Sequence, residues 1–367
     1  MLIQAAVTRE ANAPFRIESL ELDDPRPNEV LVRIVAAGIC HTDLAVVHQD
    51  LPAPTPIVLG HEGAGIVERV GSSVTHLAPG DHVVLTFPYC GECPKCRAGQ
   101  PAFCEKLMLL AISGGREDGS RTLKDGKGSV CGCFFGQSSF ATHALAYANN
   151  TVKVPREAPL EILAPLGCGI QTGAGTVLNV FKAAPGSSIA VFGCGAVGLA
   201  AVMAAKLSGC ARIIAVDRVA SRLEVARSLG ATHTVEAAAQ DYGKQLEALG
   251  QVDYSVEASG NSRALESAVK MLKPFGGTCA ILGVPTAGSQ VTFDHSHINV
   301  GRSIIAVTQG DAQPQSFIPF LVGKYLEGKL PLDKLIRVYD LKDINTAAAD
   351  SAAGRTIKPV LRMPPAH

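Results

Sequence analysis

The chain has 367 residues, too many for one ordinary hydrophobic core, so two domains are expected. Hydrophobic residues make up 47% of it and charged residues 18%, which is typical of a soluble globular protein. Lys plus Arg and Asp plus Glu number 33 each, and the resulting formal charge of zero provides no basic surplus for binding nucleic acid or an anionic membrane.

The N-terminal residues carry both charge signs and lack the apolar core of a signal peptide, so a cytoplasmic location is expected. A long uncharged run at 185–205 is interrupted by glycines at 193, 195 and 198, which argues against a membrane span. Eleven cysteines without a secretory signal favour metal or redox chemistry over disulfides.

The first third of the chain is predicted to be rich in β-strands, because apolar residues alternate at 29–36, 64–70 and 82–86. Cys40 and His61 fall in loops beside these strands, and both are ligand types that Zn²⁺ favours. Cys168, within Leu166-Gly-Cys-Gly-Ile-Gln-Thr-Gly173, is a third candidate ligand. Three protein ligands with one open position are typical of a catalytic zinc.

A second cysteine cluster has the spacing C-x2-C-x2-C-x7-C and consists of Cys90, Cys93, Cys96 and Cys104. Four closely spaced thiolates complete a tetrahedral zinc shell, so we expect a structural zinc in a lobe at 88–106. An iron–sulfur cluster uses overlapping ligand spacings and stays open as an alternative. A DNA-reading zinc finger is disfavoured because no basic helix follows. Further on, 134–143 is expected to resume strand structure.

After Cys168 the pattern changes to alternating apolar strands and helices, which predicts βαβ units and a parallel sheet. A buried strand at 188–192 runs into Gly193-Cys-Gly-Ala-Val-Gly198, followed by a helix at 199–207 and a strand at 212–217. This order is the fingerprint of a dinucleotide-binding unit. The first glycine permits the tight turn, the second lets the backbone approach a pyrophosphate, and the third allows close packing of helix on strand.

Asp217 at the end of the second strand favours NAD over NADP, because its carboxylate would bind the ribose hydroxyls and repel a 2′-phosphate. Arg218 follows directly and could accommodate that phosphate, so NADP stays open. We therefore expect a catalytic domain at 1–169, a dinucleotide-binding domain at 170–307 and a return to the first domain at 308–367.

In this order the motifs resemble the zinc-dependent medium-chain alcohol dehydrogenases over nearly the whole chain. The matching stretches are Gly-Ile-Cys-His-Thr-Asp at 38–43, Gly-His-Glu at 60–62, the four-cysteine lobe, 166–173, 193–198 and Arg-Thr-Ile-Lys-Pro-Val-Leu at 355–361. Phe-Phe-Gly-Gln-Ser-Ser-Phe at 134–140 and Gln-Ser-Phe-Ile-Pro at 315–319 are similar to the aryl-alcohol (benzyl alcohol) dehydrogenase branch. The resemblance implies an α/β protein with a β-rich GroES-like catalytic domain and a doubly wound Rossmann domain.

The resemblance also implies roles for single residues. Cys40, His61 and Cys168 would bind the catalytic zinc, and the four-cysteine lobe would bind a structural zinc, giving two zinc ions per subunit. Glu62 would be a carboxylate beside the metal ligands that can approach the metal during ligand exchange. Asp43 would orient His61, and Thr42 would accept the alcohol proton. The implied cofactor contacts are His41, Thr172, Gly193, Gly195, Ala196, Val197, Gly198, Asp217, Arg218, Arg222, Val284 and Lys358, of which His41 and Lys358 would face the pyrophosphate.

One position departs from the family pattern: many members carry a proton-relay histidine where this chain has Ala45, and His48 is a substitute candidate. The implied activity is reversible, NAD-dependent oxidation of a small primary aromatic or allylic alcohol, in a homodimer or homotetramer. Three alternatives stay open: a general short-chain alcohol dehydrogenase, a glutathione-dependent formaldehyde dehydrogenase, and a non-enzymatic dinucleotide-binding relative.

Overall fold

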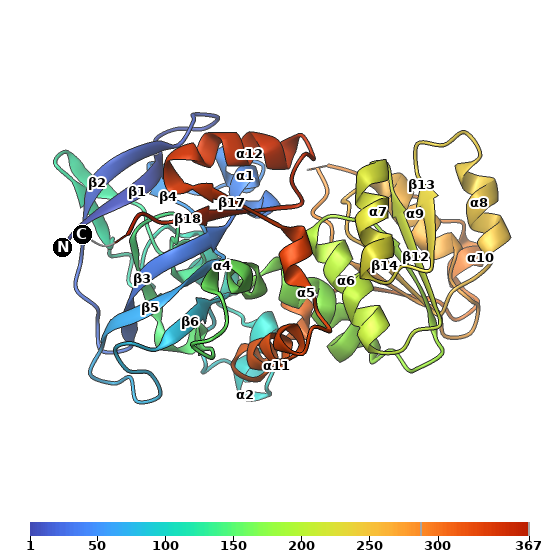
Figure 1. The fold of residues 1–367 in the computed structure, drawn as a ribbon, viewed down its shortest axis with the longest axis horizontal. Coiled ribbons are helices and arrows are strands. Elements are labelled where there is room, and N and C mark those ends of the chain that lie inside the picture. The colour runs from blue at the N-terminus through green and yellow to red at the C-terminus, as the bar shows by residue number, and fades with distance from the viewer. Residues whose placement is uncertain (287, 366–367) are drawn as a thin grey trace. The chain divides into compact units, whose positions relative to one another are not determined.

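The computed structural model describes residues 1–286 and 288–365, which form two compact units (Figure 1). Unit 1 contains Met1–Cys168, Gln313–Leu326 and the chain from Leu335 onward. Unit 2 contains Gly169–Ala312 and Glu327–Lys334. The expected bounds were 1–169, 170–307 and 308–367, whereas the structure assigns Gly169, 308–312 and Glu327–Lys334 to unit 2. The chain contributes Gln313–Leu326 to unit 1, then Glu327–Lys334 to unit 2, and only from Leu335 does it stay in unit 1.

Unit 1 is built on two sheets. Its strands are β1 (Leu2–Thr8), β2 (Arg16–Leu22), β3 (Glu29–Gly38), β4 (Ile57–Val58), β5 (Gly63–Val70), β6 (His82–Leu85), β7 (Leu123–Asp125), β8 (Gly128–Val130), β9 (His143–Tyr147), β10 (Thr151–Lys153), β17 (Ile336–Asp340) and β18 (Lys358–Arg362). One sheet has the order β4-β1-β2-β7-β8, and the other has the order β10-β6-β5-β3-β18-β17, with β9 also paired to β3. The C-terminal strand β18 thus pairs with β3 in space, although the two strands are far apart in the sequence.

Strand β3 is the central element of unit 1, because it pairs with β5, β9 and β18. Val30, Val32 and Ile34 are buried in the core, as expected for β-branched side chains in a covered strand. The strand ends at Gly38, which leaves Ile39 and Cys40 at the edge of the sheet. The burial of this strand therefore fixes where the candidate ligand Cys40 lies.

The helices of unit 1 are short, except for two near the C-terminus. They are α1 (His41–Val47), α2 (Pro94–Arg97), α3 (Leu107–Ile112), α4 (Leu160–Leu163), α11 (Pro314–Leu326) and α12 (Ile344–Ala352). The predicted strand at 134–143 was wrong over most of its length. A 3₁₀ turn occupies Phe134–Gly136, and β9 begins only at His143. Cys133, Phe135 and Ser138 have positive φ angles, which an extended strand does not allow.

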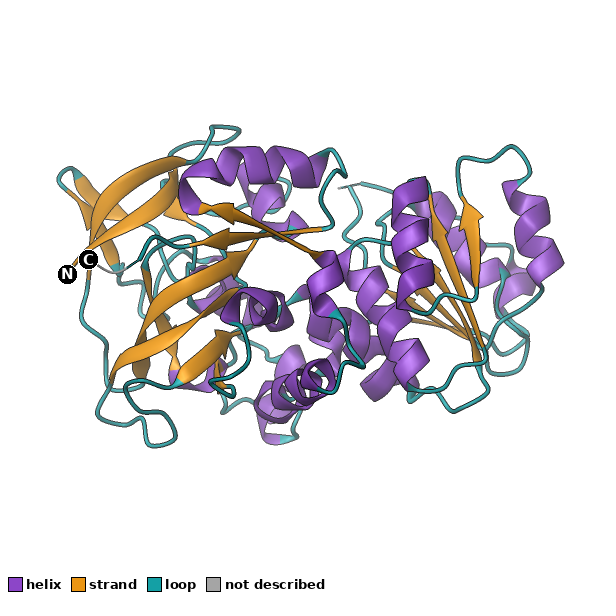
Figure 2. Ribbon diagram, in the orientation of Figure 1, coloured by secondary structure: helices purple, strands orange, loops and turns teal. Residues whose placement is uncertain are grey.

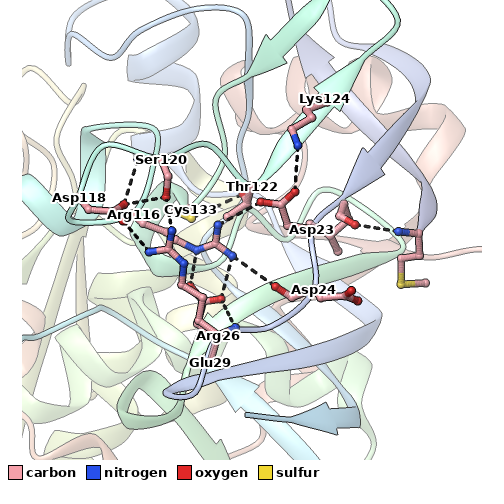
Figure 3. A network of polar contacts seen from close by, with 12 residues as sticks. Asp23, Asp24, Arg26, Glu29, Arg116, Asp118, Ser120, Thr122, Lys124 and Cys133 are labelled. Atoms are coloured by element: carbon pink, nitrogen blue, oxygen red, sulfur yellow. Dashed lines mark hydrogen bonds and ion pairs between the residues drawn. The ribbon is translucent and has the colours of Figure 1, made fainter. Parts of the chain in front are cut away.

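Arg116 joins two loops of unit 1 through a buried ion pair (Figure 3). Its Nε and Nη2 donate to the two carboxylate oxygens of Glu29 at 2.7 and 3.0 Å, and its Nη1 donates to Asp23 at 3.1 Å. Arg26 reaches in the opposite direction and donates to Asp118 at 2.8 Å, at a more exposed position. These reciprocal contacts hold the 113–122 loop against the start of β3.

Unit 2 is a doubly wound parallel sheet. Its strands are β11 (Ser188–Phe192), β12 (Arg212–Asp217), β13 (His233–Glu236), β14 (Tyr254–Glu257), β15 (Thr278–Ile281) and β16 (Ser303–Ala306). Its helices are α5 (Gly169–Gly175), the π-helix Thr176–Phe181, α6 (Ala196–Leu207), α7 (Ala220–Leu229), α8 (Tyr242–Leu249), α9 (Ser262–Lys270) and α10 (His295–Ile298). The strand order β13-β12-β11-β14-β15-β16 reverses at β11, the point where such sheets bind dinucleotides.

The two faces of this sheet are covered by different helices (Figure 2). Ala190 and Phe192 of β11 point into a core shared with α8 and α9. Val191 points to the other face, where Gly198 of α6 approaches it. Both faces being covered explains why the strands read as continuous apolar runs and not as alternating ones. None of the helices in the described ranges is long and apolar enough to cross a membrane.

Candidate active site and metal centres

The four cysteines of the lobe converge as the spacing predicts. The Sγ atoms of Cys90, Cys93, Cys96 and Cys104 all lie within 4.8 Å of one another, and none is in a disulfide. The Cys90 sulfur is 3.5 Å from that of Cys104 and 3.9 Å from that of Cys96. The edge of a zinc–thiolate tetrahedron is about 3.8 Å, so these separations fit zinc.

Backbone amides assist the same lobe. The Cys90 amide donates to the Cys104 sulfur and the Cys93 amide donates to the Cys90 sulfur, each at 3.3 Å. The amides of Glu105 and Cys96 lower the pKa of the Cys93 thiol to about 6. Such donors stabilise thiolates, the form in which cysteine binds a metal. The lobe has no open ligand position, which is the property of a structural site.

A second cluster forms where three separate loops of unit 1 meet. Cys40 precedes α1, His61 and Glu62 lie in the turn before β5, and Cys168 follows the 3₁₀ turn Ala164–Gly167. One ligand atom from each of these four residues lies within 4.8 Å of the other three. His61 and Glu62 are fully buried, so the group gathers away from bulk water. The Cys168 thiol donates to Cys40 and lowers the pKa of the Cys40 thiol well below its usual range.

Asp43 orients this cluster from behind. Its Oδ1 accepts hydrogen bonds from Nδ1 of His61 at 2.9 Å and from the Gly60 amide at 3.1 Å. Its Oδ2 accepts from the Cys40 amide at 2.9 Å, so one carboxylate ties together two of the candidate ligands. Burial by itself would lower the pKa of His61, but the Asp43 charge beside the ring raises it well above its usual value.

The other ring nitrogen of His61 supports a metal at this position. Its Nε2 is buried and has no hydrogen-bond partner within residues 1–286 and 288–365. A buried polar atom without a partner is costly, and a metal ion removes that cost. Two thiols, an imidazole with an orienting carboxylate, and a nearby glutamate make a donor set that fits Zn²⁺.

Glu62 is held by Lys358, the first residue of β18. The Nζ atom donates to Oε1 and Oε2 of Glu62 at 3.0 and 2.9 Å, and to the Ile39 carbonyl at 3.0 Å. Gly38 makes room for the carboxylate, since a Cβ there would lie 2.1 Å from Oε2 of Glu62. Lys358 was expected to face the cofactor pyrophosphate; the residue is 3% exposed, and its ammonium contacts Glu62. The pairing of β18 with β3 directs it there, and the contact with the cofactor stays a prediction.

Thr42 lies beside the cluster, and its hydroxyl is 3.8 Å from the Cys40 sulfur. Ala45 is buried within α1, and His48 ends that helix with Nδ1 2.9 Å from Asn12 Oδ1. His48 is exposed and already has a partner, so nothing in its surroundings favours a proton-relay role. His41 is exposed at the first position of α1.

The sequence did not single out the residues that enclose His61. The rings of Phe134 and Phe135 have centroids 5.6 and 4.7 Å from the His61 ring. Gln137 accepts from the Gly63 amide and donates to the His61 carbonyl, each at 3.0 Å, and thereby fixes the turn. Phe134 and Gln137 lie in a stretch that was interpreted as a strand. The available signal was the stretch Phe-Phe-Gly-Gln-Ser-Ser-Phe at 134–140, which was used only for the branch resemblance.

In unit 2 the glycine-rich turn has the geometry that the fingerprint predicts. Gly193 has a φ of 97°, and a Cβ on it would lie 2.9 Å from Ala258. A Cβ on Gly198 would lie 1.8 Å from the Gly193 carbonyl oxygen, so neither position tolerates a larger residue. Around Gly195, no heavy atom of the described residues apart from its chain neighbours lies within 4 Å of such a Cβ, so the backbone there is open to approach. The helix α6 begins at once, with Ala196 and Val197 in its first turn.

The remaining candidate cofactor residues lie in other parts of unit 2. Asp217 ends β12, and its carboxylate accepts from the amides of Cys194 at 2.6 Å and Val219 at 2.8 Å. Arg218 is exposed, whereas Arg222 of α7 has a buried Nε without a partner among the described residues. Thr172 lies in α5, and Val284 is 65% exposed in the loop after β15.

Comparison with known proteins agrees with this geometry. Residues 26–156 match the family model "Alcohol dehydrogenase GroES-like domain", and residues 196–322 match "Zinc-binding dehydrogenase". Geraniol dehydrogenase from Castellaniella defragrans is 42% identical over 98% of this chain and 97% of its own length.

Two solved structures are also similar. An alcohol dehydrogenase zinc-binding domain protein from Burkholderia ambifaria is 48% identical, with a TM-score of 0.97 and full coverage of both chains. Benzyl alcohol dehydrogenase from Acinetobacter calcoaceticus is 45% identical, with a TM-score of 0.95, over 99% of this chain and all of that one. With two zinc-type clusters and a dinucleotide-binding sheet in one chain, the protein belongs to the zinc-dependent medium-chain alcohol dehydrogenases.

Proposed function

We propose that this chain oxidises a primary aromatic or allylic alcohol to the aldehyde, with hydride transfer to NAD. The observation that carries the proposal is the buried group of Cys40, His61 and Cys168, in which Asp43 holds one nitrogen of His61 and leaves the other without a hydrogen-bond partner. Three such ligands leave one position for a substrate oxygen. The four-cysteine lobe would hold the structural zinc.

The bound groups would supply the difficult chemistry. Zinc lowers the pKa of an alcohol hydroxyl as a Lewis acid, and NAD accepts the hydride. The protein has the tasks of positioning, removing a proton and excluding water. Asp43 keeps the His61 ring in one orientation and tautomer. The Thr42 hydroxyl, which lies 3.8 Å from the Cys40 sulfur, would take the alcohol proton.

Proton release beyond Thr42 takes a route without a relay histidine. Ala45 occupies that position, and its methyl group can neither accept nor donate a proton in such a relay. Water or the cofactor ribose would receive the proton from Thr42. We therefore expect the rate of proton release to respond to buffer concentration, because buffer bases exchange protons with water at the site.

The substrate class rests on apolar surroundings and on the relatives. Phe134 and Phe135 pack on His61, so the imidazole that would hold the metal lies among apolar rings. An aromatic or allylic alcohol would bury its unsaturated part in apolar surroundings of this kind. Its oxidation is also favoured, since the new carbonyl is conjugated. The geraniol and benzyl alcohol dehydrogenases among the relatives act on alcohols of these two kinds, by their names.

NAD is the proposed cofactor because Asp217 ends β12, at the position where a carboxylate meets the adenosine ribose in this type of sheet. Arg218 and Arg222 follow closely and would weaken the discrimination against a 2′-phosphate. Hydride transfer to NADP at a lower kcat/KM is therefore expected.

The experiment is to compare kcat/KM for benzyl alcohol, geraniol and ethanol with NAD⁺ in protein of known zinc content. We expect values for benzyl alcohol or geraniol at least tenfold above that for ethanol. A preference for ethanol would retain the dehydrogenase and refute the substrate class. Activity only with formaldehyde plus glutathione would select that alternative, and a chain with one zinc or none and no turnover would indicate a non-enzymatic relative.

A further inference from the structure

Gln137 bridges the two sides of the turn that carries His61. Its side-chain Oε1 accepts from the Gly63 amide, and its Nε2 donates to the His61 carbonyl, each at 3.0 Å. These two main-chain groups flank Glu62, so one amide side chain holds the backbone on both sides of that residue. Asp43 fixes the imidazole ring of His61, whereas Gln137 fixes the backbone from which the ring extends.

The same amide also reaches the neighbouring strand. Nε2 of Gln137 donates to the carbonyl of Thr86, the residue directly after β6, at 3.2 Å. The pairing of β5 with β6 ends at Ala64 and Val84, so the amide joins the two strands just beyond the end of their own pairing. Gln137 is only 1% exposed, and two carbonyl acceptors occupy its NH₂ group, which permits a single orientation of the amide.

Thr86 continues the connection toward Cys168. Its hydroxyl donates to the Gly167 carbonyl at 2.7 Å, and the residue is fully buried. Gly167 directly precedes Cys168, and a Cβ on it would lie 2.0 Å from a main-chain carbonyl oxygen at the end of β6, so this turn packs closely on the strand. A continuous series of buried hydrogen bonds thus joins the turn of His61 to the turn of Cys168.

The separation of these two side chains decides how well they can share a metal ion. Zinc requires its nitrogen and sulfur ligands at about 2.0–2.3 Å, and His61 and Cys168 extend from different turns, so a shift of either backbone moves one ligand atom relative to the other. We propose that Gln137 is a positioning residue: its amide, together with the Thr86 hydroxyl, fixes the separation of these two ligands. The inference rests on the proposed role of Cys40, His61 and Cys168 as catalytic zinc ligands, and all the residues concerned lie within unit 1.

The test uses Gln137→Met, which keeps a side chain of similar length and removes all three hydrogen bonds. Ser138→Ala is the control in the same turn, because it removes buried hydrogen bonds to the Phe134 amide and the Val58 carbonyl, which lie outside the two ligand turns. The affinity of the catalytic site for zinc is measured by competition with a chromophoric chelator. The visible spectrum is recorded with Co²⁺ in the catalytic site and zinc in the four-cysteine lobe. Neither measurement requires turnover.

Thr86→Val tests the other half of the connection, because it removes the hydroxyl with little change in shape. Thr151→Val is its matched control. Thr151 is equally buried, in β10 of unit 1, and its hydroxyl donates to the Tyr147 carbonyl at 2.8 Å. Both substitutions therefore remove one buried hydrogen bond to a main-chain carbonyl, but only the carbonyl bonded by Thr86 precedes a candidate metal ligand.

In Gln137→Met we expect the dissociation constant for catalytic zinc to rise about 10–100-fold and the Co²⁺ spectrum to change, as when a group that orients a metal ligand is removed. Thr86→Val should raise the same constant about tenfold. Together the two substitutions should weaken zinc binding by less than the product of their separate factors, because both groups belong to one series of hydrogen bonds. Ser138→Ala and Thr151→Val should change the constant by less than about twofold and keep the spectrum.

Two results would overturn the proposal. One is a zinc affinity in Gln137→Met that matches that of Ser138→Ala, with an unchanged Co²⁺ spectrum, since Gln137 would then only stabilise its own turn. The other is equal zinc affinities and spectra in Thr86→Val and Thr151→Val, and this comparison decides the matter if Gln137→Met does not fold. A protein that holds both metals and oxidises no alcohol would refute the proposed function alone, because the zinc titration and the Co²⁺ spectrum would still be valid.

Discussion

Replacing Asp43 with asparagine tests the electrostatic support of the candidate metal site. In the structure Oδ1 accepts two hydrogen bonds, from His61 Nδ1 and the Gly60 amide, and Oδ2 accepts one, from the Cys40 amide. An asparagine in the same rotamer keeps the first two. Its NH₂ group would replace Oδ2 and face the Cys40 N–H, so two donors would meet. The negative charge behind the imidazole would also disappear.

The expected loss can be estimated from these contacts. Removing a carboxylate that supports a metal-binding histidine weakens metal binding by about 10–100-fold. This corresponds to about 1.4–2.8 kcal/mol. The unpaired Cys40 amide adds about 1–3 kcal/mol of lost folding stability, because Asp43 is fully buried. Asp43→Asn should therefore bind catalytic zinc more weakly and should also unfold more easily.

The assay is a zinc titration of metal-depleted protein in competition with a chromophoric chelator. The four-cysteine lobe serves as an internal reference, since Asp43 contacts none of its residues in the described chain. Asp50→Asn is the control, because Asp50 is exposed and the change in charge is the same. An affinity of the catalytic site within twofold of the unsubstituted protein would refute the reasoning.

Three further changes test other parts of the structure. Arg116→Met breaks a buried ion pair and should lower the free energy of unfolding by about 3–5 kcal/mol, whereas Arg26→Met, at an exposed pair, should cost less than about 1 kcal/mol; equal urea midpoints would contradict this. The Asp253 carboxylate is 2.6 Å from the Lys273 ammonium. Burial by itself would raise the pKa of Asp253, but hydrogen bonds and this cation lower it. The stability that the ionised carboxylate contributes is therefore complete above the unfolded pKa near 4, and it is lost as the pH falls through the lower folded pKa. The melting temperatures of Asp253→Asn and the unsubstituted protein should differ at about pH 7 and converge by about pH 2. A difference that stays constant with pH would exclude this contribution. Cys96→Ser should reduce the zinc content from about two to about one per chain while the catalytic metal stays bound, as elemental analysis would show.

Local chemistry in the sequence was enough to predict several parts of the molecule. The strands 188–192 and 212–217 occur with the predicted bounds, because each is a short apolar run closed by a glycine or an acid. The helix after the glycine turn begins three residues earlier than predicted, at Ala196 instead of Leu199, since glycine and small residues at its start read as turn. The four-cysteine lobe converges because its ligands lie within 15 residues, so their spacing alone restricts the geometry.

The candidate catalytic cluster required the family resemblance as well as the residues. Cys40, His61 and Cys168 are separated by up to 128 positions, and their side chains meet only because β3, the turn before β5 and the 3₁₀ turn after α4 pack in one unit. The residue types indicated that all three can bind a metal, but no local rule in the sequence predicted the distances between their ligand atoms. Asp43 was assigned behind His61 by the resemblance, and the structure places it there at 2.9 Å.

Other features depend wholly on tertiary structure. The segment 134–143 was predicted to be a strand, but Cys133, Phe135 and Ser138 adopt positive φ angles where the segment contacts His61 and the Gly63 amide. The ammonium of Lys358 lies against Glu62 because β18 pairs with β3, and no local rule in the sequence predicts that contact. Sequence by itself determined which chemical groups this protein has and where regular strands such as 188–192 and 212–217 lie. Only the tertiary structure decided which groups face one another. A buried charged or polar side chain needs a partner, and the packing of the strands and turns determines which groups lie within reach of it.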